Sequence, residues 1–184
     1  MKTNIKEIYL AGGCFWGVEK YFSLLKGVLF TEVGYANGNI NNPTYQMLID
    51  GSATHAETVY LKYDENVITL KELLDHFFRF VNPHSRYRQG NDIGKQYRSG
   101  IYYTDLSDQE IVDNYLKDLE LKTNKKVWTE SLPLSNYFKA ELYHQDYLSK
   151  NPNGYCHVDL SLLKDEERKW KEKIILVGMS ILWV

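Results

Sequence analysis

One cysteine of this chain stands where the backbone can make it reactive. Cys14 lies in residues 12–17 (GGCFWG), between an apolar run and the start of a helical pattern. The two glycines before it allow a tight turn, and a helix start behind it supplies unpaired N–H groups and the positive end of a dipole. A cysteine in such a place has a lowered pKa and is a nucleophile near neutral pH. A lone cysteine is more often a small core residue, but the flanking glycines favour chemistry here.

Residues 12–17 and four further blocks resemble the A-type peptide methionine sulfoxide reductases. The further blocks are Tyr45; residues 55–57 (HAE); residues 88–92, 94, 96–99 and 102–103; and residues 143–145 with 151–156. They follow the family's order, which chance rarely produces, and the resemblance covers residues 5–160. The chain departs from the family pattern at Thr54, where glycine is usual, at Tyr87, where a small polar residue is common, and at Asn82, where aspartate is frequent.

Reduction of a sulfoxide needs a thiolate to attack sulfur, a proton source for the oxygen and an apolar seat for the methyl group. By the resemblance, Cys14 is the nucleophile and Glu57 is the acid. Residues 55–63 alternate as a strand does, so Glu57 shares a face with Val59 and Leu61. Burial on that face would raise the pKa of Glu57 and keep a proton available near neutral pH.

The resemblance also assigns the surroundings of the reacting sulfur. Phe15 and Trp16 would wall a pocket for the S-methyl group and exclude water. Tyr45 and Tyr97 match the phenols that hydrogen-bond the sulfoxide oxygen, and neutral donors suit an oxygen that gains charge during attack. Asp92 matches a further pocket residue, which we expect to orient the phenols or a water molecule.

Cys156 is the second of two cysteines and is expected to complete the cycle. Oxygen transfer leaves Cys14 as a sulfenic acid, which condenses with a nearby thiol to a disulfide. Cys156 follows a segment that contains proline and glycine, and the resemblance implies that it is the one resolving thiol. A thioredoxin-like protein would then reduce the disulfide, and the substrate would be the S epimer of methionine sulfoxide, free or in proteins.

The apolar pattern predicts an α+β fold. The predicted strands are 5–11, 28–35, 55–63, 100–104 and 127–132, and the predicted helices are 15–25, 44–49, 70–81, 107–119, 141–148 and 160–173. Capping boxes at 69–72 and 107–110 open two of these helices. The order up to residue 104 is that of a ferredoxin-like split βαβ core, with an antiparallel-rich sheet, extra helices and an irregular C-terminal segment. Residues 84–96 are predicted to be a loop.

Composition limits the class of protein. The chain has 184 residues, is 43% hydrophobic and carries a net charge of −2, so we expect one catalytic domain over residues 1–173 without nucleic-acid or membrane partners. The apolar tail 174–184 is too short to cross a bilayer, and we assign it no role. The start lacks a secretory signal, and the two cysteines suit redox chemistry in a reducing compartment. We therefore expect a cytoplasmic monomer that needs no cofactor.

Three other classes are compatible with some of these residues. A thiol hydrolase or acyl transferase would use Cys14 with His55 or His144 as base, and it would need no reductant. A zinc site from Cys14, Cys156, His144 and His157 lacks the usual ligand spacing. A single-strand nucleic-acid patch would use Arg86, Arg88, Lys95 and Arg98 with Tyr87 and Tyr97, but the pI of about 6.2 disfavours it.

Overall fold

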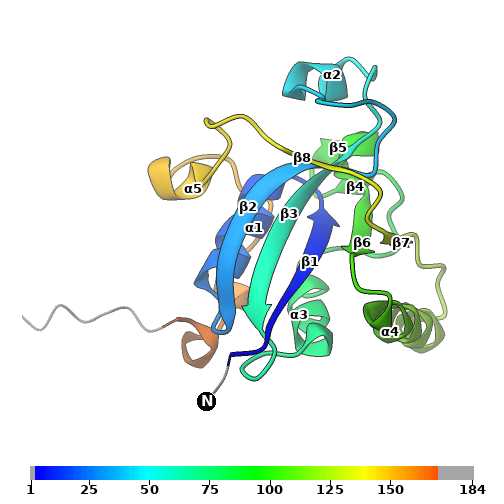
Figure 1. Ribbon diagram of the computed structural model, residues 1–184, viewed down its shortest axis with the longest axis vertical. Coiled ribbons are helices and arrows are strands. Elements are labelled where there is room, and N and C mark those ends of the chain that lie inside the picture. Colours follow the sequence, from blue (N-terminus) through cyan, green and yellow to red (C-terminus); the bar gives the residue numbers. More distant parts are fainter. Residues whose placement is uncertain (1–2, 170–184) are drawn as a thin grey trace, which may run out of the picture.

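A six-stranded sheet is the centre of the computed structural model, which describes residues 3–169 (Figure 1). The strands are β1 (Ile5–Gly12), β2 (Val28–Ala36), β3 (Ala56–Asp64), β6 (Ser99–Tyr103), β7 (Glu130–Pro133) and β8 (Tyr137–Lys139), in the order β7-β6-β1-β3-β2-β8. Neighbouring strands are antiparallel except for β6 and β7. The central order β6-β1-β3-β2 is that of a split βαβ core, so the predicted α+β fold is confirmed.

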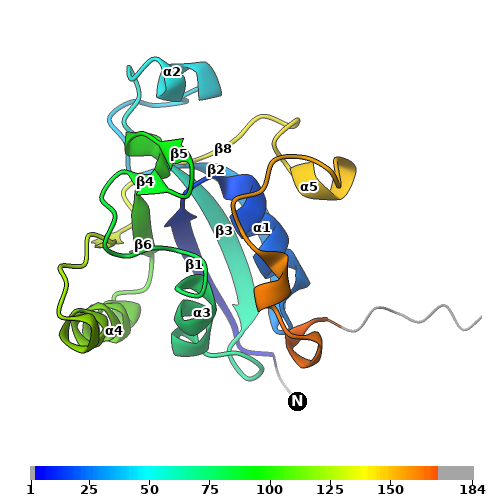
Figure 2. The same cartoon turned by 180° about the vertical axis from the view of Figure 1, so that it is seen from behind.

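Two helices cover one face of this sheet, α1 (Phe15–Leu24) and α3 (Leu70–Phe77) (Figure 2). The Thr69 hydroxyl accepts from the Glu72 backbone and the Glu72 carboxylate accepts from Thr69, so the predicted capping box opens α3. The main core lies between these helices and the sheet. Its fully buried members include Ile8, Leu10, Val18, Phe22, Val33, Val59, Leu61, Leu73, Leu74 and Phe77. This core fixes the position of the first turn of α1 over the sheet.

The other face of the sheet carries a smaller buried cluster of alanines and tyrosines under a crossing segment. Tyr9, Ala11, Ala36, Ala56 and Tyr102 form a second buried cluster, against which Tyr60, Leu134 and Tyr137 pack. The segment after β7 crosses the sheet there and adds β8 to the edge of β2 (Figure 1). The sequence did not predict β8, because only three residue pairs hold it and it has no periodicity of its own.

A short helix, α2 (Tyr45–Ile49), and the two-stranded sheet of β4 (Arg88–Gln89) and β5 (Asp92–Ile93) lie beyond one end of the main strands (Figures 1 and 2). A 3₁₀ turn (Lys95–Tyr97) follows β5. The prediction of a loop over 84–96 is therefore wrong at β4, at β5 and at the 3₁₀ turn, while the remaining residues form turns and bends. Strands of two residues are set by tertiary contacts and leave no periodic signal in the sequence.

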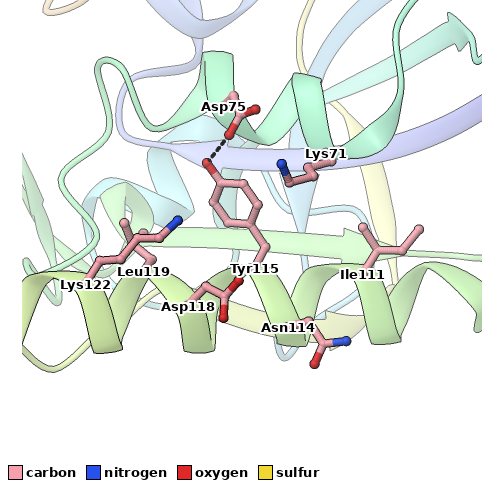
Figure 3. Close-up of a pocket in the computed structure, with 8 residues that line it drawn as sticks. All are labelled: Lys71, Asp75, Ile111, Asn114, Tyr115, Asp118, Leu119 and Lys122. Carbon is pink, nitrogen blue, oxygen red and sulfur yellow. Dashed lines mark hydrogen bonds between the residues drawn. The ribbon is translucent and has the colours of Figure 1, made fainter.

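The long helix α4 (Ser107–Thr123) lies beside α3, and a groove of about 260 Å³ separates them (Figure 3). The ring of Tyr115 stacks on Phe78, and its hydroxyl donates to Asp75 Oδ1 at 2.7 Å. The predicted capping box at 107–110 is wrong, because Asp105 Oδ1 accepts the Ser107 N–H at 2.9 Å in its place. The residues that line this groove include no cysteine or histidine.

The C-terminal part of the described chain is irregular, as expected, but less helical. The predicted helix 141–148 is reduced to α5 (Tyr147–Lys150). Within the described part of the predicted helix 160–173, the structure has only two 3₁₀ turns (Leu160–Leu162 and Asp165–Glu167). Tertiary bonds override helix propensity here, since Arg79 forms two 2.7 Å hydrogen bonds with Glu167. The predicted tail 174–184 lies outside the described residues.

Within residues 3–169 no helix combines the length and apolar character needed to span a bilayer.

Candidate active site

Cys14 is the residue from which the first helix starts. It lies two residues after the end of β1, occupies the N-cap position of α1 and is only 7% exposed. Gly13 before it has φ +90, a left-handed conformation that glycine adopts at little cost. A Cβ on Gly13 would also lie 2.6 Å from Gln89 Cβ, so β4 closes over the turn. The tight turn and this close approach together bury the sulfur at the helix start.

The carboxyl group of Glu57 lies against the same helix start. Glu57 projects from β3, is 1% exposed, and accepts the backbone N–H of Phe15 at 3.1 Å. The pKa of Glu57 is raised to about 8: burial is the main cause, the Phe15 N–H offsets part of the rise, and the charge of Asp92 adds a smaller part to it. A protonated carboxyl group is therefore available next to Cys14 at neutral pH.

The thiol of Cys14 does not have the lowered pKa that its helix position suggested. Burial raises the pKa of Cys14 well above its usual value, and the Glu57 carboxylate adds to the rise. Hydrogen bonding by the Trp16 backbone N–H lowers the pKa and recovers only part of this. The direction of this shift is opposite to the one expected from the helix start, because loss of water outweighs the helix terminus.

Two phenols converge on the same atoms from different elements. Tyr45 lies in the first turn of α2 and Tyr97 ends the 3₁₀ turn after β5. Their hydroxyls lie close enough to affect each other's pKa, and both side chains interact electrostatically with Glu57 and Cys14. Burial raises the pKa of both, so both are neutral donors. The structure therefore brings Cys14, Glu57, Tyr45 and Tyr97 into one site.

Glu141 holds α2 in place and was not found from the sequence. One of its carboxylate oxygens accepts the Tyr45 backbone N–H at 2.9 Å, and the other accepts the Tyr35 hydroxyl at 2.6 Å. Thr44 caps the helix by accepting from the Met47 N–H. These contacts fix the direction in which the Tyr45 phenol leaves the backbone. Glu141 sits outside every regular element, so no periodicity could have indicated it.

The indole of Trp16 is fixed on both sides. Its ring stacks on Tyr147 with centroids 3.7 Å apart, and its Nε1–H donates to His144 Nδ1 at 3.1 Å. Phe15 is fully buried, and its ring centroid lies 5.0 Å from that of His144. Phe15 and Trp16 therefore form a rigid apolar wall beside Cys14. Tyr147 was not singled out from the sequence.

Asp92 contacts the segment that carries the second cysteine. Its Oδ2 accepts the Tyr155 hydroxyl at 3.0 Å and lies 3.9 Å from His157 Nδ1. It also contributes to the raised pKa values of Cys14 and Glu57. The sequence suggested that Asp92 orients the phenols or a water molecule. The hydrogen bond observed for its carboxylate is with Tyr155.

Cys156 lies against α1, one turn after Cys14. A Cβ on Gly17 would be 3.1 Å from Cys156 Sγ and 2.8 Å from Val158 Cγ2, so the absent side chain of Gly17 makes room for the segment. The Cys156 thiol donates to the Val158 carbonyl at 3.1 Å, and burial raises its pKa. Both cysteines are free. The structure thus describes the state with two thiols.

Comparison with known proteins decides which family has this site. Residues 6–174 match the family model described as peptide methionine sulfoxide reductase. The chain belongs to this family. The chain is 54% identical over 156 residues to peptide methionine sulfoxide reductase MsrA of Clostridium perfringens strain 13, covering 85% of this chain and 99% of that one.

Solved structures of the family have the same fold. Reduced Mxr1 from Saccharomyces cerevisiae superposes with a TM-score of 0.78 at 37% identity, covering 84% of this chain and 92% of that one. Mxr1 in complex with Trx2 superposes with a TM-score of 0.55 at 29% identity, covering 80% of this chain and 89% of that one. The chain is therefore an oxidoreductase that acts on peptide methionine sulfoxide.

The other classes considered from the sequence are not favoured for this reductase. His55 packs at Gly38 with its ring 5.7 Å from that of Phe138, and His144 Nδ1 accepts from the Trp16 indole; among the described residues neither ring hydrogen-bonds to Cys14. Within residues 3–169 no group of three or more His, Cys, Asp or Glu side chains is arranged to hold a metal ion.

The proposed nucleic-acid patch is divided by the fold of the reductase. Arg98 is buried, donates to the carbonyls of Thr54, Lys95 and Asn37, and pairs with Glu130 at 3.0 Å. Tyr97 belongs to the active site. Arg98 is thus a structural residue that ties together the loops before β3 and after β2.

Proposed function

We propose that this reductase acts on the S epimer of methionine sulfoxide, free and in proteins, with Cys14 as nucleophile and Glu57 as acid. The 3.1 Å hydrogen bond from the Phe15 N–H to the Glu57 carboxyl group carries the proposal. It holds a carboxyl group with a pKa of about 8 beside the residue that follows Cys14. A proton donor and a sulfur nucleophile then share one dry site.

In the first step the sulfoxide oxygen passes to Cys14. Glu57 gives its proton to this oxygen while the bond from oxygen to the substrate sulfur breaks and a bond from oxygen to the Cys14 sulfur forms. The thiol proton of Cys14 replaces the proton that Glu57 gave, so the carboxyl group ends the step as it began. The products are methionine and Cys14 sulfenic acid.

The surroundings of the two groups orient the substrate. The phenols of Tyr45 and Tyr97 donate hydrogen bonds to the oxygen, and the wall of Phe15 and Trp16 receives the methyl group. Asp92 supports this arrangement from the edge of the site. With sulfur, oxygen and methyl each held by a different part of the site, only one configuration at sulfur fits. The resemblance to the family assigns this configuration to the S epimer.

In the second step the thiol of Cys156 displaces hydroxide from the sulfur of Cys14. A disulfide forms, the sulfur–oxygen bond breaks, and the thiol proton leaves with the hydroxide as water. A thioredoxin-like dithiol then reduces the disulfide by thiol–disulfide exchange. The complex of yeast Mxr1 with Trx2 supports this choice of reductant.

An assay on both epimers of a methionine sulfoxide peptide, with dithiothreitol as reductant, tests the proposal. The wild type should consume one epimer, and Cys14→Ser should consume neither. Peptide mapping after one turnover without reductant should show a disulfide between Cys14 and Cys156. Activity in the Cys14→Ser variant, or equal rates on the two epimers, would contradict the proposal.

The proposal includes the organisation of the protein. We take residues 1–173 as one catalytic domain, supported by the family match over residues 6–174. We take the enzyme as a cytoplasmic monomer, a location with which two free thiols agree. Sedimentation velocity on the full chain measures the oligomeric state, and cell fractionation measures the location.

A further inference from the structure

Cys156 is held beside the active site by the residues on either side of it. The Tyr155 hydroxyl donates to Asp92 Oδ2 at 3.0 Å. His157 Nε2 lies 3.1 Å from the carbonyl oxygen of Gly12, which can only accept, so Nε2 carries the hydrogen and donates. Gly12 ends β1, two residues before Cys14. The two bonds therefore attach the Cys156 segment to the backbone and the carboxylate that border Cys14.

The His157 ring is enclosed by the turn that precedes Cys14. Its Nε2 would lie 3.1 Å from a Cβ on Gly13, and its side chain is almost fully buried. Among the described residues its Nδ1 has no hydrogen-bond partner, and the Asp92 carboxylate is the acidic group nearest to it, at 3.9 Å. The bond to the Gly12 carbonyl is thus the contact that fixes the ring.

The sulfur of Cys156 packs on the first turn of α1, the helix that Cys14 caps. Gly17 lies three residues after Cys14 and belongs to this first turn. Cys156 Sγ packs over the bare backbone of Gly17. The anchored segment therefore presents its thiol within one helical turn of the sulfur that becomes oxidised.

We propose that Tyr155 and His157 are positioning residues for disulfide formation. They hold Cys156 where its thiol can attack the sulfenic sulfur of Cys14, with release of water as described above. Neither residue donates to the sulfoxide oxygen, so the first step does not need their hydrogen bonds. This inference rests on the proposed function, because it concerns the second step of that cycle.

Single turnovers without reductant separate the two steps. Methionine formed after acid quench measures the first step, and the Cys14–Cys156 disulfide measured by alkylation and mass spectrometry reports the second. Dimedone measures the sulfenic acid that waits between them. In Tyr155→Phe and His157→Leu we expect methionine formation within about twofold of wild type and disulfide formation at least fivefold slower, with more dimedone adduct.

Matched variants distinguish positioning from general damage. His157→Gln keeps a donor for the Gly12 carbonyl and should restore much of the disulfide rate. His84→Leu removes another histidine-to-carbonyl bond, at 2.9 Å to Lys126, and Tyr87→Phe removes a similarly exposed phenol; both should behave as wild type.

Three results would overturn the inference. These are wild-type disulfide rates in Tyr155→Phe and His157→Leu, an equal slowing in His84→Leu, or a parallel loss of methionine formation in the first step. If the wild type itself forms no Cys14–Cys156 disulfide, the proposed function fails in its second step, and that outcome is distinguishable from the other three.

Discussion

Replacing Glu57 by glutamine tests the acid role most directly. The glutamine side chain has nearly the same size, and its carbonyl can still accept the Phe15 N–H, which Glu57 accepts at 3.1 Å. It has no proton to give to the sulfoxide oxygen. Loss of a general acid costs roughly 10²–10⁴-fold in rate, so we expect first-turnover methionine formation to fall by that factor.

The pH dependence gives a second, independent measurement. With the pKa of Glu57 at about 8, the protonated fraction falls from about nine-tenths at pH 7 to about one-tenth at pH 9. The first step of the wild type should therefore slow about tenfold over that range. Glu57→Gln should not show this slowing. Rapid acid quench with chromatography of methionine measures both proteins.

The same substitution should make the Cys14 thiol more reactive toward an alkylating agent, although it slows sulfoxide reduction. The Glu57 carboxylate contributes to the raised pKa of Cys14, so its removal lowers that pKa. At pH 9 iodoacetamide should alkylate Cys14 faster in Glu57→Gln, although sulfoxide reduction is slower. Glu19→Gln is the matched control. Glu19 is also a buried carboxyl group, but it lies on α1 and accepts the Asp146 N–H instead of the Phe15 N–H. A variant with the wild-type rate and the wild-type pH profile would refute the reasoning.

Three further predictions concern stability and the second step. Burial raises the pKa of Glu19 to about 7 from 4.5, so the folded state holds this proton more tightly than the unfolded chain. The free energy of unfolding of the wild type should therefore fall as pH rises between these two values, by about 1.4 kcal/mol for each pH unit. Between pH 5 and pH 8, urea denaturation should show a smaller fall for Glu19→Gln than for the wild type. Arg98→Leu removes the side-chain donor to three carbonyls and the ion pair of Glu130, which still accepts the Tyr102 hydroxyl. It should cost about 3–5 kcal/mol in thermal unfolding, whereas exposed Arg88→Leu should cost under about 1 kcal/mol. Gly17→Ala should slow disulfide formation, because its Cβ would lie 3.1 Å from Cys156 Sγ; an unchanged rate would show that the segment is free to shift.

The regular part of the fold could be predicted because its signals are local. The alternation of residues 55–63 gave β3, and the capping box at Thr69 gave the start of α3. The strands β4, β5 and β8 have two or three residues each and exist only through their pairing partners. The run after Leu160 has helical composition, but the pairing of Glu167 with Arg79 holds it in another conformation.

The membership of the site could be predicted, but its electrostatics could not. The resemblance to the family suggested Cys14, Glu57, Tyr45 and Tyr97, and the structure brings them together. The direction of the Cys14 pKa shift depends on how much water surrounds the sulfur, which the sequence does not show. The contacts of Tyr155 and His157 join residues more than 60 positions apart and follow no pattern along the chain.

The burial of Cys14 has a consequence for how the enzyme survives its working conditions. Hydrogen peroxide oxidises thiolates much faster than thiols, and a sulfur that stays protonated in a dry turn is a poor target for it. We therefore expect oxygen to reach this sulfur chiefly from a methionine sulfoxide seated in the pocket. The catalyst would thereby resist the same oxidant whose damage it reverses.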